Sequence, residues 1–189
     1  EIQPNRFLQI GNDFNGNRIT GGDDFQNNVI GNQFNDNIIT REFIKNRIGN
    51  GFNANEILVE FEDNIIGNGF NNNDILGDTS GNGYFNKNEI GHYFNENNII
   101  AQFVNNKIGN DFHNNTIQDA YDSGNYVEFT DNIIGYSFSN NNIDVTFNNN
   151  RIGLEFNNNT ISYDENTKVF VTEFESSNHP GAGLTIETA

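Results

Sequence analysis

The chain of 189 residues contains no cysteine, no methionine and no tryptophan, and only two prolines. Without cysteine there is no disulfide, no thiolate nucleophile and no thiolate metal ligand. Without methionine, Glu1 does not represent a translation start, so we expect a processed form or part of a longer protein. No apolar run approaches the roughly 18 residues that a membrane-spanning helix needs, and we expect no membrane insertion.

Positive charge is also scarce. Nine Lys and Arg stand against 26 Asp and Glu, which gives a net charge of −17. This charge argues against binding to nucleic acids or to anionic membranes. Only 34% of the residues are hydrophobic, which is little for a globular core. A polar, acidic composition of this kind is also typical of disordered chains, so order has to be argued from the pattern.

The pattern is a repeat, F-x-x-N-x-I, which two consecutive copies show clearly: Phe61, Asn64 and Ile66, then Phe70, Asn73 and Ile75. Fifteen Phe residues have Asn three positions later and Ile two positions after that. Disorder does not require a strict register, so the repeat predicts a regular repeating fold. The fifteen Phe are at positions 14, 25, 34, 43, 52, 61, 70, 85, 94, 103, 112, 129, 138, 147 and 156.

Two kinds of nonapeptide alternate without a slip. In the A type Ile is followed by Gly, as at Ile66-Gly67, and in the B type it is not, as at Ile75-Leu76. The unit is therefore 18 residues long, and one unit would form one coil of a solenoid. Gly and Asn are poor helix formers, whereas N-x-I has the period of a strand, and Asn suits the bends between strands.

We therefore predict an all-β protein, a parallel β-solenoid of about eight two-sided coils with 18 residues each. Stacked coils about 4.8 Å apart would place Ile on Ile and Phe on Phe inside a rod about 40 Å long. The Asn columns would point inward and bond along the stack, as Asn ladders do in cross-β structures. Residues 1–9 would form an N-terminal cap, 10–163 the solenoid, and 164–189 a C-terminal cap or the start of a following domain, with strands expected at Lys168–Glu175 and Leu184–Ala189.

Three insertions interrupt the 18-residue spacing, all between the Ile and the Phe of a B-type nonapeptide. Equivalent positions stay in line in a solenoid, so we expect all three on one side, a common way to build a binding face. Two of them would bring together the candidate binding residues Asp78, Asn82, Asp119, Tyr121 and Asp122, which suit a sugar. The alternative is that they are tolerated surface loops. The insertions are Gly21–Asp24, Leu76–Tyr84 and Gln118–Glu128.

The second insertion also has the oxygen spacing of a calcium loop, in GDTSGNGYFNKNEI. Asp78, Ser80, Asn82 and Glu89 would be the ligands. The competing interpretation is that Asp, Ser, Asn and Gly are turn residues, and Glu89 belongs to a strand of the repeat. If the protein has a cofactor, we expect calcium.

Other candidate residues have simpler interpretations beside the functional one. Glu42 and Glu60 would be neighbours in one column, where the like charges would raise the pKa of one carboxyl group. Paired carboxylates are also what glycosidases use. The alternative is a solvated acidic face. Leu58, Leu76 and Ile100 follow inward Ile residues and would form an outward apolar column suited to a partner, or scattered surface residues. His92, His113 and His179 belong to no recognisable constellation with a Ser or Cys nucleophile, so we interpret none as catalytic.

The stretches NNVIGNQFNDNIIT, NRIGNGFNANEI and NKIGNDFHNNTI resemble tandem I-G-N-x-F-x-x-N-x-I repeats of tail-fibre-like and other virion proteins from phages of Bacteroidetes bacteria. The resemblance covers about residues 10–163. It implies a structural shaft of a phage fibre or surface appendage, on a virion, outside the cell or at its surface, with homo-oligomer partners such as a trimer, other fibre or virion subunits, or a cell-surface glycan. It carries over no catalytic residues.

An enzyme remains the alternative. A tailspike-like, polysaccharide-degrading solenoid would use acidic residues in and around the insertions: Asp24, Asp78, Asp119, Asp122 and Glu128.

Overall fold

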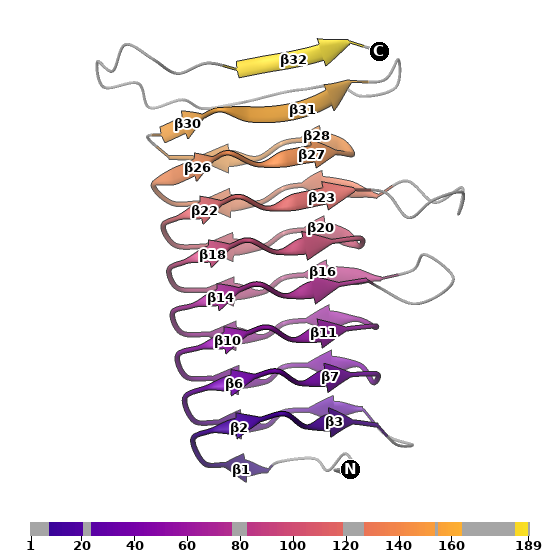
Figure 1. The fold of residues 1–189 in the computed structure, drawn as a ribbon, viewed down its shortest axis with the longest axis vertical. Helices are drawn as coiled ribbons and strands as arrows, with labels where there is room; N and C mark the ends of the chain where they lie inside the picture. Colours follow the sequence, from indigo (N-terminus) through magenta and orange to yellow (C-terminus); the bar gives the residue numbers. More distant parts are fainter. Residues whose placement is uncertain are drawn as a thin grey trace.

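The protein is a four-sided coil whose short parallel strands stack into a rod, as seen in a computed structural model (Figure 1). The structure describes residues 8–20, 24–76, 83–118, 127–153, 155–163 and 184–188. The coils without an insertion have the predicted 18 residues, and the coils stack in the predicted parallel register, with Phe above Phe and Ile above Ile. The expected strand at Lys168–Glu175 lies outside the described residues.

Each coil contains four short strands, so the rod has four sheets. The first sheet contains the Ile of the A-type nonapeptides, in β1 Gln9–Ile10, β5 Val29–Ile30, β9 Arg47–Ile48, β13 Ile65–Ile66, β17 Glu89–Ile90, β21 Lys107–Ile108, β25 Ile133–Ile134 and β29 Arg151–Ile152. The second sheet contains the Phe that follows, in β2 Phe14–Asn15, β6 Phe34–Asn35, β10 Phe52–Asn53, β14 Phe70–Asn71, β18 Phe94–Asn95, β22 Phe112–His113, β26 Ser137–Ser139 and β30 Glu155–Asn157.

The other two sheets repeat this order with the B-type nonapeptides. The third sheet comprises β3 Arg18–Ile19, β7 Ile38–Ile39, β11 Glu56–Ile57, β15 Asp74–Ile75, β19 Asn98–Ile99, β23 Thr116–Gln118, β27 Asn142–Asp144, β31 Asn159–Tyr163 and β32 Leu184–Thr188. The fourth comprises β4 Phe25–Gln26, β8 Phe43–Ile44, β12 Phe61–Glu62, β16 Tyr84–Asn86, β20 Gln102–Val104, β24 Glu128–Thr130 and β28 Thr146–Asn148. Residues 184–188 thus add a ninth strand to the third sheet, parallel to β31.

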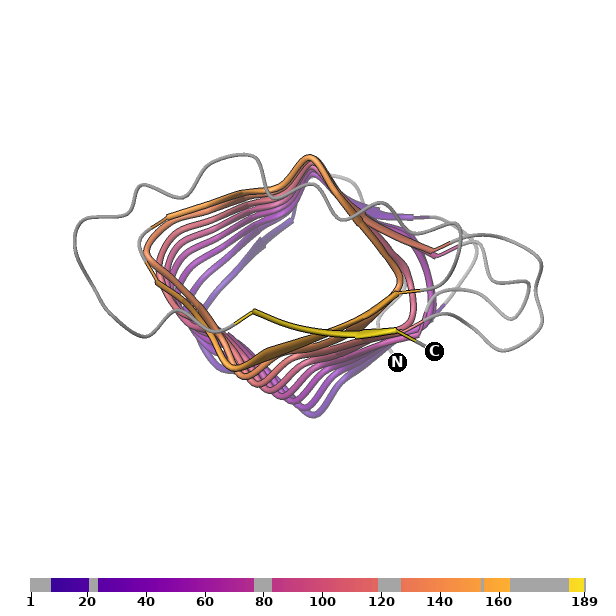
Figure 2. The same ribbon diagram turned by 90° about the horizontal axis from the view of Figure 1, so that it is seen from above.

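The prediction of a two-sided coil was wrong, because each nonapeptide bends twice and the cross-section has four corners (Figure 2). One bend is set by the residue two positions after each Phe, which has a positive φ in all fifteen copies, for example Asp63 and Asn72. This left-handed conformation turns the chain after a strand of only two or three residues. Ten of the fifteen are Asn or Asp, the non-glycine residues that tolerate it best.

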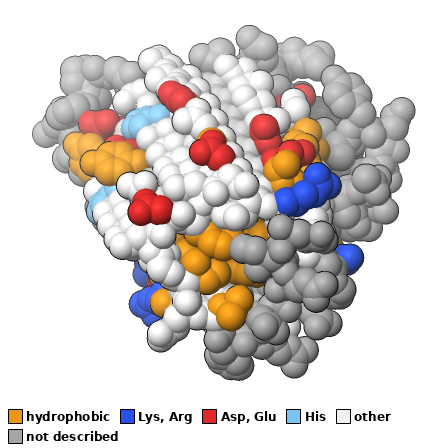
Figure 3. Space-filling model, turned by 60° about the horizontal axis from the view of Figure 1, so that its bottom comes forward, with side chains coloured by type: hydrophobic (Ala, Val, Ile, Leu, Met, Phe, Trp, Pro, Cys, Tyr) orange, Lys and Arg blue, Asp and Glu red, His pale blue; other side chains and the backbone are white. Residues whose placement is uncertain are grey.

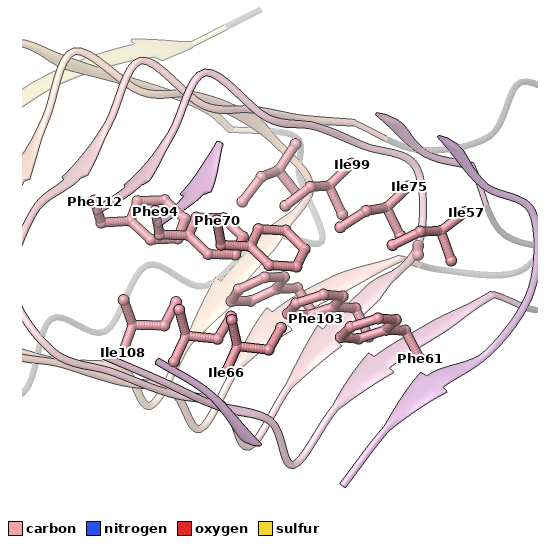
Figure 4. Close-up of a cluster of buried hydrophobic side chains, with 14 of the residues drawn as sticks. Ile57, Phe61, Ile66, Phe70, Ile75, Phe94, Ile99, Phe103, Ile108 and Phe112 are labelled. Carbon is pink, nitrogen blue, oxygen red and sulfur yellow. The ribbon is translucent and has the colours of Figure 1, made fainter. Parts of the chain in front are cut away.

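The core consists of four columns of apolar side chains (Figure 4). The Phe of the second and fourth sheets form two stacks in the middle, and within a stack neighbouring rings lie 4.8–5.2 Å apart and nearly parallel, as for Phe70 and Phe94. Between the stacks most rings meet edge to face, as Phe61 and Phe70 do at 5.9 Å. Both are favoured aromatic geometries, and burying each side chain contributes about 1.5–3 kcal/mol. The Ile columns of the first and third sheets close the two sides.

Two columns of buried Asn run beside the Phe stacks. Asn64 and Asn106 are 0% and 1% exposed, so the prediction that the Asn columns point inward is confirmed. The Asn64 amide donates to the Phe43 carbonyl at 2.8 Å and to Asn88 Oδ1 at 3.1 Å. Its own Oδ1 accepts from the backbone N–H and the amide of Asn46. Both donors and both lone pairs of the amide are therefore used.

The Gly of each A-type nonapeptide occupies a corner where neighbouring coils approach closely. A Cβ at Gly109 would lie 2.0 Å from the Gly91 carbonyl oxygen, and one at Gly67 would lie 2.8 Å from that of Gly49. The backbone N–H of Gly67 donates to the carbonyls of both Ile48 and Gly49. Only glycine permits this contact between main chains.

Replacing Asn64 with Leu should destabilise the fold by about 1–3 kcal/mol, because Asn46 loses its acceptor and the Phe43 carbonyl loses a buried donor. Urea unfolding followed by circular dichroism would measure the change. Asn98→Leu, at a partly exposed position of the third sheet, is the control and should change stability much less. Equal effects of the two substitutions would show that the buried ladder has no special role.

Replacing Gly109 with Ala should cost about 1–3 kcal/mol, because the added methyl group overlaps the Gly91 carbonyl and forces two coils apart. The matched control is Gly11→Ala, at the same repeat position in the first coil, where an added Cβ has no atom within 4 Å. Thermal melting of both variants tests the argument, which fails if Gly11→Ala is as destabilising as Gly109→Ala.

Candidate functional site

The insertions predicted from sequence begin and end at one corner of the rod, between the third and fourth sheets. We call this the insertion corner; in a coil without insertion it is Thr40–Glu42. The two longer insertions connect β15 to β16 and β23 to β24, and in the third sheet β15 and β23 are separated only by β19. Their starting points are thus two coils apart, about 10 Å along the rod.

Most of the candidate ligand residues fall within the insertions. Asp78, Ser80, Asn82, Asp119, Tyr121 and Asp122 lie outside the described residues. The remaining calcium candidate, Glu89, lies on β17 in the first sheet, with its carboxylate 3.7 Å from Lys107 Nζ on the next coil. Within the described part of the chain, no group of three or more His, Asp or Glu residues is arranged to hold a metal ion.

The described edge of the insertion corner is acidic. Burial raises the pKa of the Glu42 carboxyl, and the carboxylates of Asp24, on the coil before, and Glu62 raise it further. The neighbour predicted from sequence to act on Glu42 was Glu60, whereas the neighbouring charges that act on it here are Asp24 and Glu62. Glu62 in turn binds Lys87 Nζ at 2.6 Å, and this bond raises the pKa of the exposed lysine.

The apolar column predicted at the same corner is only partly exposed. Leu58, Leu76 and Ile100 follow the third-sheet Ile column and are half-buried, each with its backbone N–H bonded to the coil before. More exposed apolar side chains occur elsewhere in the described chain, at Val29, Ile65, Tyr93, Ile133 and Tyr136, and Tyr84 is exposed at the insertion corner itself. Three of these, Val29, Ile65 and Ile133, are in the outward column of the first sheet.

Sequence reasoning missed two outward polar ladders. After the corner glycines, Asn50 Oδ1 accepts the backbone N–H of Asn68 at 2.8 Å, and along the second sheet Asn53 Oδ1 accepts both the N–H and the amide of Asn71. In the view of Figure 3, much of the described surface consists of backbone and of side chains that are neither charged nor hydrophobic. The signal was present in N-x-F-N, whose Phe is the first residue of the F-x-x-N-x-I phrase, in several A-type nonapeptides.

Two histidines replace Asn in these ladders. His92 Nδ1 accepts the backbone N–H of Asn110 at 3.2 Å. His113 Nδ1 lies within hydrogen-bond distance of Ser139 Oγ, and its Nε2 lies 3.4 Å from Asp111 Oδ1. The structure therefore does bring a serine and an acid to His113, which sequence spacing did not predict. The ladder accounts for the arrangement, since His113 and Ser139 occupy consecutive positions of the Asn column.

The first sheet has a groove along its outer face. It has a volume of about 440 Å³ and lies between Ile65 and Ile133, beside Glu89 and Lys107. Three corner glycines, Gly91, Gly109 and Gly135, form its other edge. Since glycine has no side chain, the surface along this edge of the sheet is recessed relative to the outward side chains of the column.

Removing the charge at residue 42 should stabilise the protein at neutral pH. The folded state raises the pKa of Glu42 above its ordinary value of 4.5, so ionisation costs stability as the pH rises through the raised pKa. Glu42→Gln should therefore melt at a higher temperature than the parent at pH 7, with the difference vanishing below about pH 4. Melting curves across this range test the sign, and a constant difference at all pH values would contradict it.

The described part of the chain contains no helix that could span a lipid bilayer. Comparisons with models of protein families, with curated proteins and with solved structures found no match to this chain.

Proposed function

We propose that the protein is a structural shaft of a phage fibre or cell-surface appendage, and that insertions at one corner bind a receptor glycan. The observation that carries the proposal is the unbroken bonding along the rod. In each buried Asn column, every described amide from the second coil to the sixth is bonded to the next coil, as between Asn64 and Asn88 or Asn73 and Asn97. A bonded stack of this kind resists bending and holds what it carries at a fixed distance.

The location of the insertions supports the second part. Both longer insertions start and end at the insertion corner, and their starting strands lie two coils apart. Loops positioned by a rigid scaffold commonly carry recognition. Asp78, Asn82, Asp119, Asp122 and Tyr121 would supply the polar oxygens and the aromatic ring that a sugar needs, and calcium is the ion that such oxygens would favour. A virion or cell-surface location, and assembly with further copies or other fibre subunits, belong to the same proposal.

A tailspike-like enzyme is the second candidate, and one observation favours it. Burial and the neighbouring Asp24 raise the pKa of Glu42, and polysaccharide hydrolysis uses a carboxyl with a raised pKa beside an ionised one. Cleavage of host polysaccharide by the purified protein, lost in Glu42→Gln, would favour the enzyme over the shaft.

Shortening both long insertions should abolish glycan binding and leave the rod folded. Residues 76–84 and 118–128 would each be replaced by the three-residue connection between Ile143 and Phe147, which joins the same two sheets. Binding of the parent and the variant to a glycan array is the measurement, with circular dichroism to verify the fold. Deleting two residues of the short insertion at 21–24 is the control and should leave binding intact. A folded double-loop variant that binds as the parent does would refute the recognition role.

A further inference from the structure

The outward column of the first sheet has a palindromic order. Consecutive coils place Ile65, Glu89, Lys107 and Ile133 side by side in parallel register. Ile65 and Ile133 are 38% and 48% exposed, and the Glu89–Lys107 pair is mostly exposed as well. Read from either end, the column is apolar, charged, charged, apolar, with the two charges of opposite sign.

We infer that this face binds a second copy of the chain, with the two rods antiparallel and related by a two-fold axis between Glu89 and Lys107. In an isologous contact residue i meets residue j, and j meets i. The axis places Glu89 opposite Lys107 of the second copy and Lys107 opposite its Glu89. Ile65 then meets Ile133 of the second copy, and Ile133 meets its Ile65. All four positions are therefore complementary.

Parallel rods in register are disfavoured by the same residues. They would place Glu89 against Glu89 and Lys107 against Lys107, and facing like charges oppose association. The intrachain Glu89–Lys107 pair, at 3.7 Å, becomes one half of an alternating square of four charges only in the antiparallel arrangement.

The groove can receive the isoleucine side chains of the second copy. It runs beside this column between Ile65 and Ile133, with Gly91 and Gly109 along its edge. An isoleucine of the second copy can lie in this groove against Gly91 and Gly109.

The outer coils of this column carry like charges. Three of the nine Lys and Arg, namely Arg47, Lys107 and Arg151, lie in this column of a chain with net charge −17. On the outer coils Arg47 would face Arg151 of the second copy, and Arg151 would face its Arg47, so these two contacts oppose association. By register each of these Arg lies one coil from an acidic residue of the second copy, Asp131 or Asp63, which reduces the repulsion. The antiparallel contact therefore depends on the four central positions.

Charge exchange tests the inference. Glu89→Lys and Lys107→Glu should each weaken self-association of the full chain roughly tenfold or more, measured by sedimentation velocity at low salt. An equimolar mixture of the two variants should associate again, because each pair then joins opposite charges. The double variant, with both residues exchanged, should associate as the parent does. A parent protein that stays monomeric at all concentrations would overturn the inference.

Disulfide trapping tests the direction of the rods, and the absence of cysteine leaves no background. An oxidised mixture of Ile65→Cys and Ile133→Cys chains should form a covalent dimer. Ile65→Cys alone should not, since its two copies would lie about 14 Å apart along the rods. Ile38→Cys, in the third sheet, is the control for random collision. Cross-linking of Ile65→Cys with itself, or dissociation of the dimer by Leu58→Asp, would place the contact elsewhere and refute the proposal.

Discussion

The fold depends on one interaction, the hydrogen bonding of buried asparagine amides from coil to coil. An amide has two donors and two acceptor sites, and Asn64 uses all four: its donors go to Phe43 and Asn88, and its acceptor sites serve Asn46. Aspartate would lose both donors and place charge in the core, whereas leucine would leave main-chain groups unpaired. Among the described residues, the buried side-chain atoms without a partner are Asn86 Oδ1 and Thr130 Oγ1, both outside the ladders.

The apolar columns and the corner glycine follow from the spacing that the ladder requires. Amides bond at this period only when the coils are as close as strands in a sheet, and at that distance Phe70 and Phe94 stack ring on ring at 4.9 Å. The same distance forces main chains together at Gly91 and Gly109, where a side chain would not fit. Ladder, ring stacks and glycine corner therefore have one common period, and a change at any of them disturbs the others.

The sequence predicted these features to different degrees. The 18-residue unit, the parallel stacking and the inward columns were predictable, because each requires one residue type at a fixed position. The four corners were not, since the left-handed position after each Phe accepts Lys45, Ala54 and Glu96 as well as Asn and Asp. The role of His92 was not predicted, because its imidazole Nδ1 takes the place of an Asn side-chain oxygen as hydrogen-bond acceptor, and the repeat pattern considers only Asn at this position. The Glu42 neighbours depend on side-chain directions at a corner, which register does not fix.

A solenoid of this kind separates the residues that fold it from those that it can present to partners. Most buried positions in the described part of the chain belong to an Asn ladder or to a Phe or Ile column, so variation is largely confined to the outward columns and the insertion corner. Outward residues of one column lie one coil apart, so a partner that binds along a column contacts its residues in a fixed order. In the first sheet the order Ile65, Glu89, Lys107 and Ile133 is complementary to its own reverse, since Ile then meets Ile and Glu meets Lys. A repeating interior does not demand this match, and it is the kind of order that recognition of an antiparallel copy requires.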